Sequence, residues 1–286
     1  MQNSMMAVVV FVIVVAGSAV LAGPYPPAGG QTGSTAFSVT DSRFVEWAAS
    51  ATIVRGLREI DNPSGGYAYY GGVNGTPANT APIGMPTQPQ TSADSVSLGQ
   101  GGTATLTFSV PISHSVGADG NPYDFAVFGN GFSSGSLEWC KPAFVEVSSD
   151  GLNFFRFPSV SLTPAGTQLG SYGEVDPTNL YDLAGKDPVG YGTGFNLGEL
   201  AGVSPLLNIY DVTQVRLVDC VDDINPLYAT HDSQGNIING PWPANSVAGS
   251  EGFNLAGVGV LHEAPEPASA SLLMLGAMAL LRKRRH

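Results

Sequence analysis

Short stretches of alternating hydrophobic and polar residues run along the chain, and this alternation is typical of β-strands with one buried face. In the clearest of them, Thr103 to Val110, the side chains of Ala104, Leu106 and Phe108 share one face and threonines occupy the other. Similar or wholly apolar stretches predict strands at 124–128, 143–148, 154–157, 215–219 and 258–262. No long helical period appears, and 37 glycines with 21 prolines suit many turns. The pattern therefore predicts an all-β sandwich or barrel.

Three other regions complete the predicted layout of the body. Residues 37–60 are ambiguous, because Phe44, Trp47 and Ala51 fit one face of a helix whereas residues 51–54 equally fit a strand. Residues 61–95 are rich in Gly, Pro, Asn, Thr and Tyr and predict a long irregular loop. The tripeptide at 149–151, Ser-Asp-Gly, predicts a hairpin turn between two strands. No internal repeat is visible, so we expect a single domain.

The amino-terminal end carries a predicted export signal. Residues 5–22 are almost wholly apolar, and Val20 and Ala22 stand at the minus-three and minus-one positions that a signal peptidase recognises before Gly23. Residues 23–35 have too little apolar content to pack and predict a flexible leader. We therefore expect a signal peptide at 1–22, a flexible leader at 23–35 and a β-sandwich domain at 36–263.

The carboxyl-terminal end, residues 264–286, combines three parts in order. A Pro-Glu-Pro triplet precedes an apolar run of about 14 residues, and the run ends at four consecutive cations. A short apolar helix followed by cations tends to insert with its charges on the cytoplasmic side, so the preceding chain lies outside. The run is shorter than the roughly 20 residues of a permanent span, which favours transient membrane insertion over an ordinary transmembrane anchor.

This order of parts resembles the PEP-CTERM sorting signal of bacterial surface proteins. The resemblance implies that a membrane protease-transpeptidase, the exosortase, recognises the triplet, removes the tail and leaves the body at the cell surface or in the extracellular matrix. Export is thus signalled at both ends of the chain. The expected sorting residues are Pro265, Glu266, Pro267, Arg282, Lys283, Arg284 and Arg285.

Removal of the two terminal segments changes the charge of the protein. The full chain has 11 basic and 23 acidic residues, and the tail takes four basic residues and one acid with it. The body keeps 7 basic against 22 acidic groups, a formal charge of about −15. This excludes nucleic acid as a partner, because binding phosphate needs clustered Lys and Arg. Cations are the natural counter-ligands, although plain solubility outside the cell explains the same acidity.

Two cysteines, Cys140 and Cys220, lie in the body. In an exported protein an even pair favours a disulfide over a metal site or a redox motif, since the compartment is oxidising and no CxxC spacing occurs. The bond would close a loop of about 80 residues and add on the order of 4 kcal/mol at best. Two buried thiols without a bond are the alternative.

Several strings between Val96 and Leu261 carry a second resemblance, among them YDFAVFGNGF at 123–132, VEVSSDGLNF at 145–154 and VRLVDCVDD at 215–223. They resemble a family of uncharacterised bacterial cell-surface proteins that often carries the same sorting tail. The pairing of VEVSSDG with VRLVD also resembles galactose-binding-like jelly rolls, the architecture of discoidin domains and carbohydrate-binding modules. These resemblances imply a jelly-roll-like β-sandwich with long Gly/Pro-rich loops. Gly129 stands where the family pattern has Glu, so no ligand role is carried to that position.

The sequence shows none of the local strings that mark common enzymes. It contains no GxSxG elbow, no HExxH, no phosphate-binding GxxxxGK and no CxxC. The spacing of His114, His231 and His262 matches no zinc template. We therefore expect a non-catalytic protein. The alternative is an extracellular polysaccharide hydrolase that uses a carboxylate pair, since 22 acids allow many combinations.

Two kinds of ligand fit the polar and aromatic residues of the loops. Calcium prefers clustered hard oxygens, and the loops after 218 provide them. Sugars bind flat aromatic faces with polar side chains beside them, and several aromatic residues lie in Gly/Pro-rich loops. Solvated turn aspartates and ordinary packed aromatics are the alternatives. The expected calcium ligands are Asp219, Asp222, Asp223, Asp232 and Asn236. The expected sugar-binding residues are Tyr191, Tyr228 and Trp242, and Tyr69 and Tyr70 lie in a loop of the same kind.

Overall fold

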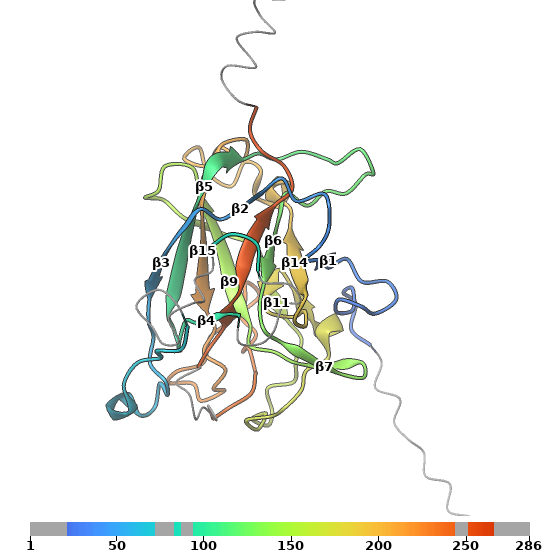
Figure 1. Cartoon of the computed structure of the whole chain (residues 1–286). Coiled ribbons are helices and arrows are strands. Elements are labelled where there is room, and N and C mark those ends of the chain that lie inside the picture. Colours follow the sequence, from blue (N-terminus) through green and yellow to red (C-terminus); the bar gives the residue numbers. More distant parts are fainter. Residues whose placement is uncertain (1–21, 72–82, 87–93, 244–250, 266–286) are drawn as a thin grey trace, which may run out of the picture.

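The computed structural model describes residues 22–71, 83–86, 94–243 and 251–265, and it shows two antiparallel sheets packed face to face (Figure 1). The prediction of an all-β sandwich is confirmed. In the described part of the chain, helical structure is limited to three short 3-10 turns, η1 (Pro63–Gly65), η2 (Pro177–Asn179) and η3 (Leu197–Leu200). No helix in these residues is long and apolar enough to cross a membrane. The predicted signal segment, except for Ala22, and most of the sorting tail lie outside the described residues.

Each sheet is built from strands that are far apart in the sequence. The first sheet has the order β1 (Phe37–Ser38), β14 (Tyr191–Phe195), β6 (Phe125–Phe128), β17 (Gly257–Val260), β2 (Glu46–Trp47). The second has the order β10 (Phe155–Arg156), β9 (Ala143–Ser148), β15 (Val212–Asp219), β5 (Thr103–Ile112), β3 (Ser50–Val54), and β13 (Leu183–Ala184) also pairs with β9. From β5 onward the long strands alternate between the second and the first sheet, which gives the jelly-roll-like crossing of the sandwich.

Three small two-stranded ladders lie outside these sheets. They pair β11 (Val160–Ser161) with β12 (Leu180–Tyr181), β16 (Asn254–Leu255) with β4 (Val96–Ser97), and β7 (Phe132–Ser134) with β8 (Leu137–Trp139). The last of these is a hairpin that projects at the lower right of Figure 1.

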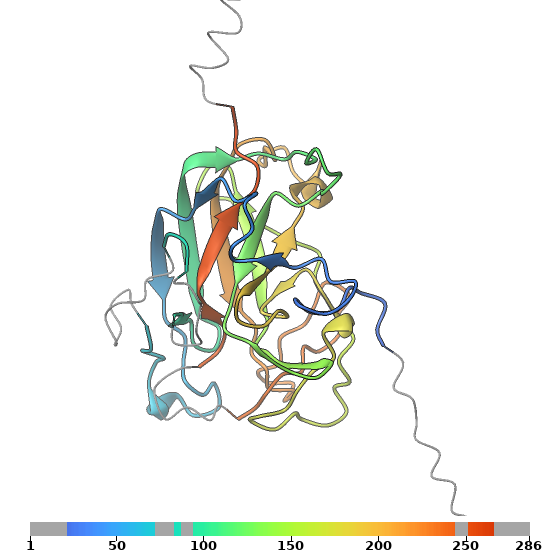
Figure 2. The same cartoon turned by 45° about the vertical axis from the view of Figure 1, so that its right-hand side comes forward.

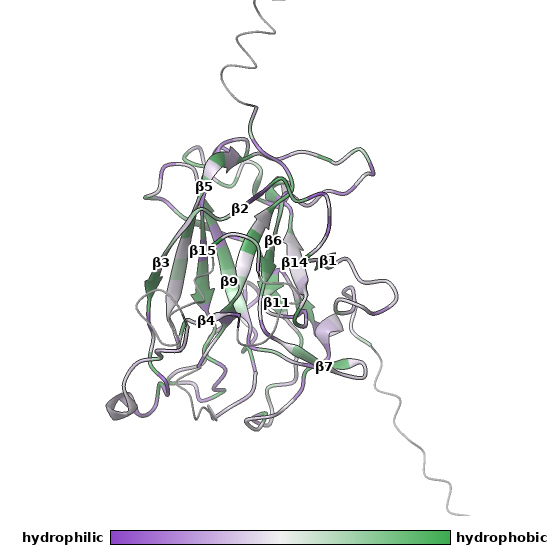
Figure 3. Ribbon diagram, viewed as in Figure 1, coloured by the Kyte–Doolittle hydropathy of each residue, from purple (hydrophilic) through white to green (hydrophobic). Residues whose placement is uncertain are grey.

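Period-two alternation explains the core. Leu106 and Val145 of the second sheet and Phe125 and Val127 of the first belong to one buried cluster between the sheets. The strand β6 is apolar on its other face as well, where Ala126 belongs to a second buried cluster, whereas the outer faces of β5 and β15 carry polar residues. Figure 3 shows the hydrophobic colour concentrated on strands such as β6 and β9, whereas the loops are mostly pale or hydrophilic.

The ambiguous region at 37–60 forms short strands and no helix. Residues 51–54 belong to β3, which pairs with β5 in register Ile53 to Ala104. Phe44 and Trp47 pack with Phe128 on the outer face of the first sheet, at ring-centroid distances of 5.6 and 5.3 Å. The apolar residues whose spacing fits a helix are therefore buried in another way, by packing on the outer face of the first sheet.

Two further expectations for the body can be compared with the structure. The Ser-Asp-Gly hairpin is confirmed, since β9 and β10 pair across it and Asp150 accepts hydrogen bonds from the amides of Leu152 and Asn153, both at 2.8 Å. The leader expected to be flexible instead packs against the sandwich. Ala28 is fully buried, and Tyr25 and Gly29 make hydrogen bonds to the body.

Candidate functional site

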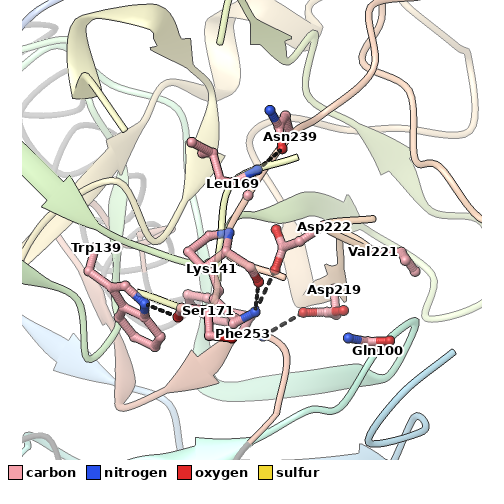
Figure 4. A network of polar contacts seen from close by, with 12 residues as sticks. Gln100, Trp139, Lys141, Leu169, Ser171, Asp219, Val221, Asp222, Asn239 and Phe253 are labelled. Carbon is pink, nitrogen blue, oxygen red and sulfur yellow. Dashed lines mark hydrogen bonds and ion pairs between the residues drawn. The ribbon is translucent and has the colours of Figure 1, made fainter. Parts of the chain in front are cut away.

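Two of the acids predicted to bind calcium, Asp219 and Asp222, belong to a buried polar network at the carboxyl end of β15 (Figure 4). Asp219, the last residue of β15, accepts hydrogen bonds from the backbone amides of Gly101, at 3.0 Å, and Phe253. Asp222 forms an ion pair with Lys141 at 2.8 Å, and the same ammonium group donates to the carbonyl of Pro241 at 2.6 Å. Asp219, Asp222 and Lys141 are all buried.

The cation beside Asp222 is therefore Lys141. Arg216 of β15 pairs instead with Glu146 at 2.6 Å on the outer face of the second sheet. Burial raises the pKa of Asp222, and the Lys141 ammonium opposes that shift. Burial and the charge of Asp222 together raise the pKa of Asp219 well above its usual range.

The other predicted calcium ligands serve local turns. Asp232 accepts from the amides of Ser161, Gln234 and Asn236, and the side-chain amide of Asn236 also donates to it. Asp223 accepts from the amide of Asn225 at 2.8 Å. The five predicted ligands thus divide among separate sets of contacts. Within the described ranges, no group of three or more His, Cys, Asp or Glu side chains is placed to hold a metal ion, so these contacts give calcium no support.

The predicted aromatic residues do not form a common platform. Trp242 is buried at 8% exposure, and Tyr191 packs its ring against Gly29 and Gly30. Tyr228 is half-buried in the loop after β15. No ring contact joins any two of these three residues in the described structure.

An exposed aromatic pair occurs instead on the β7–β8 hairpin. Phe132, 48% exposed, stacks on Trp139 with ring centroids 4.7 Å apart, and the Trp139 indole donates to the carbonyl of Ser171 at 3.0 Å. The next residue, Tyr172, is 72% exposed. Trp139 is not among the expected sugar-binding residues, because the sequence of this hairpin has no strong periodic signal.

Cys140 and Cys220 are both buried and are free thiols in this structure. They belong to one apolar cluster on the outer face of the second sheet, where the amide of Cys220 donates to the carbonyl of Pro142. Burial raises the pKa of both thiols. The disulfide between them stays a prediction.

Glu138, in β8 beneath the exposed aromatic pair, is a fully buried acid that the sequence did not single out. One carboxylate oxygen accepts from Ser133 Oγ at 2.7 Å, and the other has no hydrogen-bond partner. Burial, with smaller contributions from the charges of Asp187 and Glu174, raises the pKa of Glu138 from 4.5 to about 7.

This shift predicts a stability that falls as the pH rises. Between pH 4.5 and about 7, Glu138 keeps its proton in the folded protein and loses it in the unfolded chain. The free energy of unfolding therefore has the full contribution of this proton below pH 4.5 and has lost it above about pH 7. The Glu138→Gln variant has no such proton. We expect urea unfolding of the wild type to lose about 2–3 kcal/mol more than this variant between pH 4 and pH 8. Equal losses in the two proteins would contradict the assignment.

A second group of polar side chains lines a cavity at the other end of the sandwich, where His262 follows β17. The cavity has a volume of about 460 Å³, within the size range of small-molecule sites. Its apolar part is formed by Phe37, Val45, Tyr123 and Leu261. The polar part consists of Ser42, Arg43, Asp119, Asn121 and His262, with Gly117 and Ala118 completing the lining.

Arg43 is fixed on one wall of this cavity. Its guanidinium group forms ion pairs with Asp41 and Asp119, both at 2.7 Å, and lies 4.9 Å from the centre of the Phe37 ring. Asp119 also accepts from the amide of Asn121 at 3.0 Å, which orders the loop that carries both side chains. The wall therefore presents a preformed set of hydrogen-bonding groups with its positive charge already balanced.

A second wall is formed by His262, which a buried acid orients. Asp124 is fully buried, and its carboxylate accepts from Nδ1 of His262 and from Nδ1 of His114, each at 3.0 Å. It also accepts from the amides of Ser115 and Leu197, both at 2.8 Å. An ionised carboxylate only accepts hydrogen bonds, so each imidazole donates to Asp124 through its Nδ1–H. In the neutral tautomer with this proton, the other ring nitrogen of His262, Nε2, has a lone pair that accepts a hydrogen bond.

Sequence reasoning missed this arrangement because its members are far apart in the chain. His262 lies 138 residues from Asp124, and the two meet because β17 pairs with β6. The one local signal is Asp124, the acid at the start of the apolar 124–128 strand. A carboxylate buried in such a strand needs hydrogen-bond donors from elsewhere in the chain.

A much smaller cavity, of about 40 Å³, lies beside β14 and contains buried charges. Asp182, Lys186 and Asp187 line it together with Pro26 and Pro27. Burial, with the nearby Glu199, raises the pKa of Asp182 to about 9. This volume holds about one water molecule, whereas a ring the size of benzene needs roughly 150 Å³. A sugar does not enter this cavity in the described conformation.

Comparisons with known proteins give no relative from which a site could be transferred. No protein-family model matches the chain, and no curated protein is significantly similar to it.

Proposed function

We propose that this is an exported, surface-sorted, non-catalytic protein that binds carbohydrate in the cavity lined by Arg43, Asp119, Asn121 and His262. The observation that carries the proposal is the pairing of an apolar floor with fixed hydrogen-bonding groups in about 460 Å³. The proposal of export and exosortase processing rests on the residues of the two termini. The proposed ligand is a neutral sugar unit of an extracellular polysaccharide.

The chemistry of the lining favours a neutral sugar over other small molecules. A sugar ring has an apolar face that packs on aromatic and aliphatic side chains, and hydroxyl groups around its edge that both donate and accept. Tyr123 and Val45 offer the first kind of contact. His262 Nε2 and the Asp119 carboxylate accept from hydroxyls, and Asn121 both donates and accepts. An acidic sugar fits less well because Arg43 already pairs with two carboxylates.

Binding is favoured over catalysis by what surrounds His262. An acid that orients a histidine is also part of many hydrolase sites, but those sites place a nucleophile on the other ring nitrogen. Among the described residues, no hydroxyl or thiol is hydrogen-bonded to His262 Nε2. We therefore assign Asp124 the role of orienting His262, and we assign His262 the role of accepting a hydrogen bond from the sugar.

The proposal is tested by glycan binding of the mature protein. A glycan array identifies the sugar, and calorimetry then gives its affinity for the wild type and for His262→Ala. We expect the variant to bind at least tenfold more weakly, since it loses an oriented acceptor and exposes the charge of Asp124. The matched control is His231→Ala, because His231 is exposed in a separate turn. Silence across the array, or equal binding by the wild type and His262→Ala, would contradict the proposal.

The same samples test the alternative reading as a hydrolase. Incubation of the protein with the bound polysaccharide, followed by measurement of reducing ends, should show no release. If the wild type releases reducing ends and His262→Ala does not, the cavity is a catalytic site and the proposal of a non-catalytic protein is wrong.

A further inference from the structure

The residues that follow the predicted signal segment form a strap along the side of the sandwich, beside β14 (Figure 2). This amino-terminal strap is defined as residues 23–35. The amide of Tyr25 donates to the carbonyl of Thr178 at 3.1 Å, and the Tyr25 ring stacks on Tyr181 at a centroid distance of 5.0 Å. Further along, the amide of Gly29 donates to Asp187 at 2.8 Å. The strap is thus held at several points.

The first of its described contacts with the body is made by Gly23 itself. The Gly23 nitrogen donates to Thr178 Oγ1 at 2.5 Å, and this hydroxyl donates onward to Asp176 Oδ1 at 2.6 Å. A side chain at position 23 would place its Cβ 2.2 Å from the carbonyl oxygen of Thr178. Only glycine fits there, and the preceding residue, Ala22, is exposed. The close fit therefore begins at the bond where the sequence predicts cleavage.

We propose that Thr178 and Asp176 form a binding site for the α-ammonium group of Gly23. The inference goes beyond carbohydrate binding and rests on the predicted cleavage after Ala22. In that step a signal peptidase adds water across the peptide bond, which leaves a carboxylate on Ala22 and an ammonium group on Gly23. The amide nitrogen of the precursor has one N–H and no charge. The new amine has three donors and a positive charge one hydroxyl away from the Asp176 carboxylate.

Cleavage therefore strengthens the attachment of the strap. Charge-assisted hydrogen bonds are roughly twice as strong as neutral ones, and an α-amino group is protonated below about pH 8. The strap also covers the buried charges beside β14, since Lys186 donates to the carbonyl of Pro26 at 3.0 Å and Pro26 lines their cavity. The processed protein thus seals this cavity more firmly than the precursor does.

The test compares two forms of the protein, each continuing to His286. One begins at Gly23 and the other retains Ala22, which moves the free amine by one residue. Hydrogen exchange at pH 7 reports opening of the strap through the amide of Tyr25. We expect about tenfold lower protection of this amide when Ala22 is retained. The first residue of the exported protein, identified by amino-terminal sequencing, should be Gly23.

The variant Asp176→Asn separates the charge from the local structure. Asp176 also accepts from the amide of Thr178 at the start of η2, and Asn is an equally good residue at that position. We expect Asp176→Asn to lower the protection of Tyr25 about five- to tenfold in the form that begins at Gly23 and less than twofold in the form with Ala22. Asp211→Asn, at an exposed aspartate, is the matched control. Equal effects of Asp176→Asn in both forms, equal protection of the two parent forms, or a different first residue would overturn the proposal.

Discussion

Replacement of Lys141 by Met lowers the free energy of unfolding by about 3–5 kcal/mol, the cost of leaving one member of a buried ion pair without its partner. Asp222 is 1% exposed, and its Oδ1 has no hydrogen-bond partner even with Lys141 present. Without the ammonium group, the Asp222 carboxyl must take up a proton or remain as an uncompensated charge. The carbonyl of Pro241 loses its donor as well. Urea unfolding at pH 7 measures the loss.

The double variant Lys141→Met with Asp222→Leu distinguishes the charge from the packing. Removal of both charges leaves an apolar contact, so we expect the double variant to be more stable than Lys141→Met alone. A loss below about 1 kcal/mol in Lys141→Met would show that the ion pair does not hold the loops after β15 together. A double variant less stable than the single one would place the cost in packing instead of charge.

Asp124→Asn is expected to affect both stability and binding. The carboxylate accepts four hydrogen bonds in a fully buried position, whereas an amide offers one oxygen and brings two donors of its own. At least one N–H of its surroundings is left without an acceptor, which costs about 2–4 kcal/mol. The imidazole of His262 can relieve the conflict by moving its proton to Nε2. The hydrogen-bond acceptor that the proposal assigns to Nε2 is then lost, and sugar binding should fall at least tenfold.

This expectation can be checked by two measurements on one protein. Unfolding in urea gives the stability, and the ¹⁵N chemical shifts of the His262 ring report which nitrogen carries the proton. Asp211→Asn is the matched control for the substitution. A folded Asp124→Asn protein that keeps the Nδ1 proton and full affinity for the sugar would show that Asp124 does not orient His262 for binding.

The strands can be predicted from the sequence because the alternation of apolar and polar residues that marks a strand lies within a few consecutive residues. The alternation at 103–110 and the Ser-Asp-Gly turn at 149–151 specify local pairing, and both are found in the structure. The strap was missed for a related reason. Its small, polar residues have no periodicity, and they pack because their backbone groups find partners on a distant part of the body, as the amide of Gly29 does on Asp187.

The candidate site was harder to predict because it depends on contacts between distant residues. The acids after β15 were expected to bind calcium, whereas the cation found beside Asp222 is Lys141, 81 residues before it in the chain. The aspartates at 222 and 223 are adjacent in the chain, but only the first joins the network. His262 and Asp124 gave no joint signal at all. Strand pairing brings them together, and their separate local patterns do not contain that pairing.

The central claim is that the cavity lined by Arg43 and His262 is the carbohydrate-binding site. The most direct test is a crystal structure of the mature protein with the sugar identified on the array. The proposal predicts a sugar ring in this cavity, with one hydroxyl within about 3 Å of His262 Nε2. A sugar bound instead on the exposed Phe132–Trp139 pair, with the cavity empty, would contradict it.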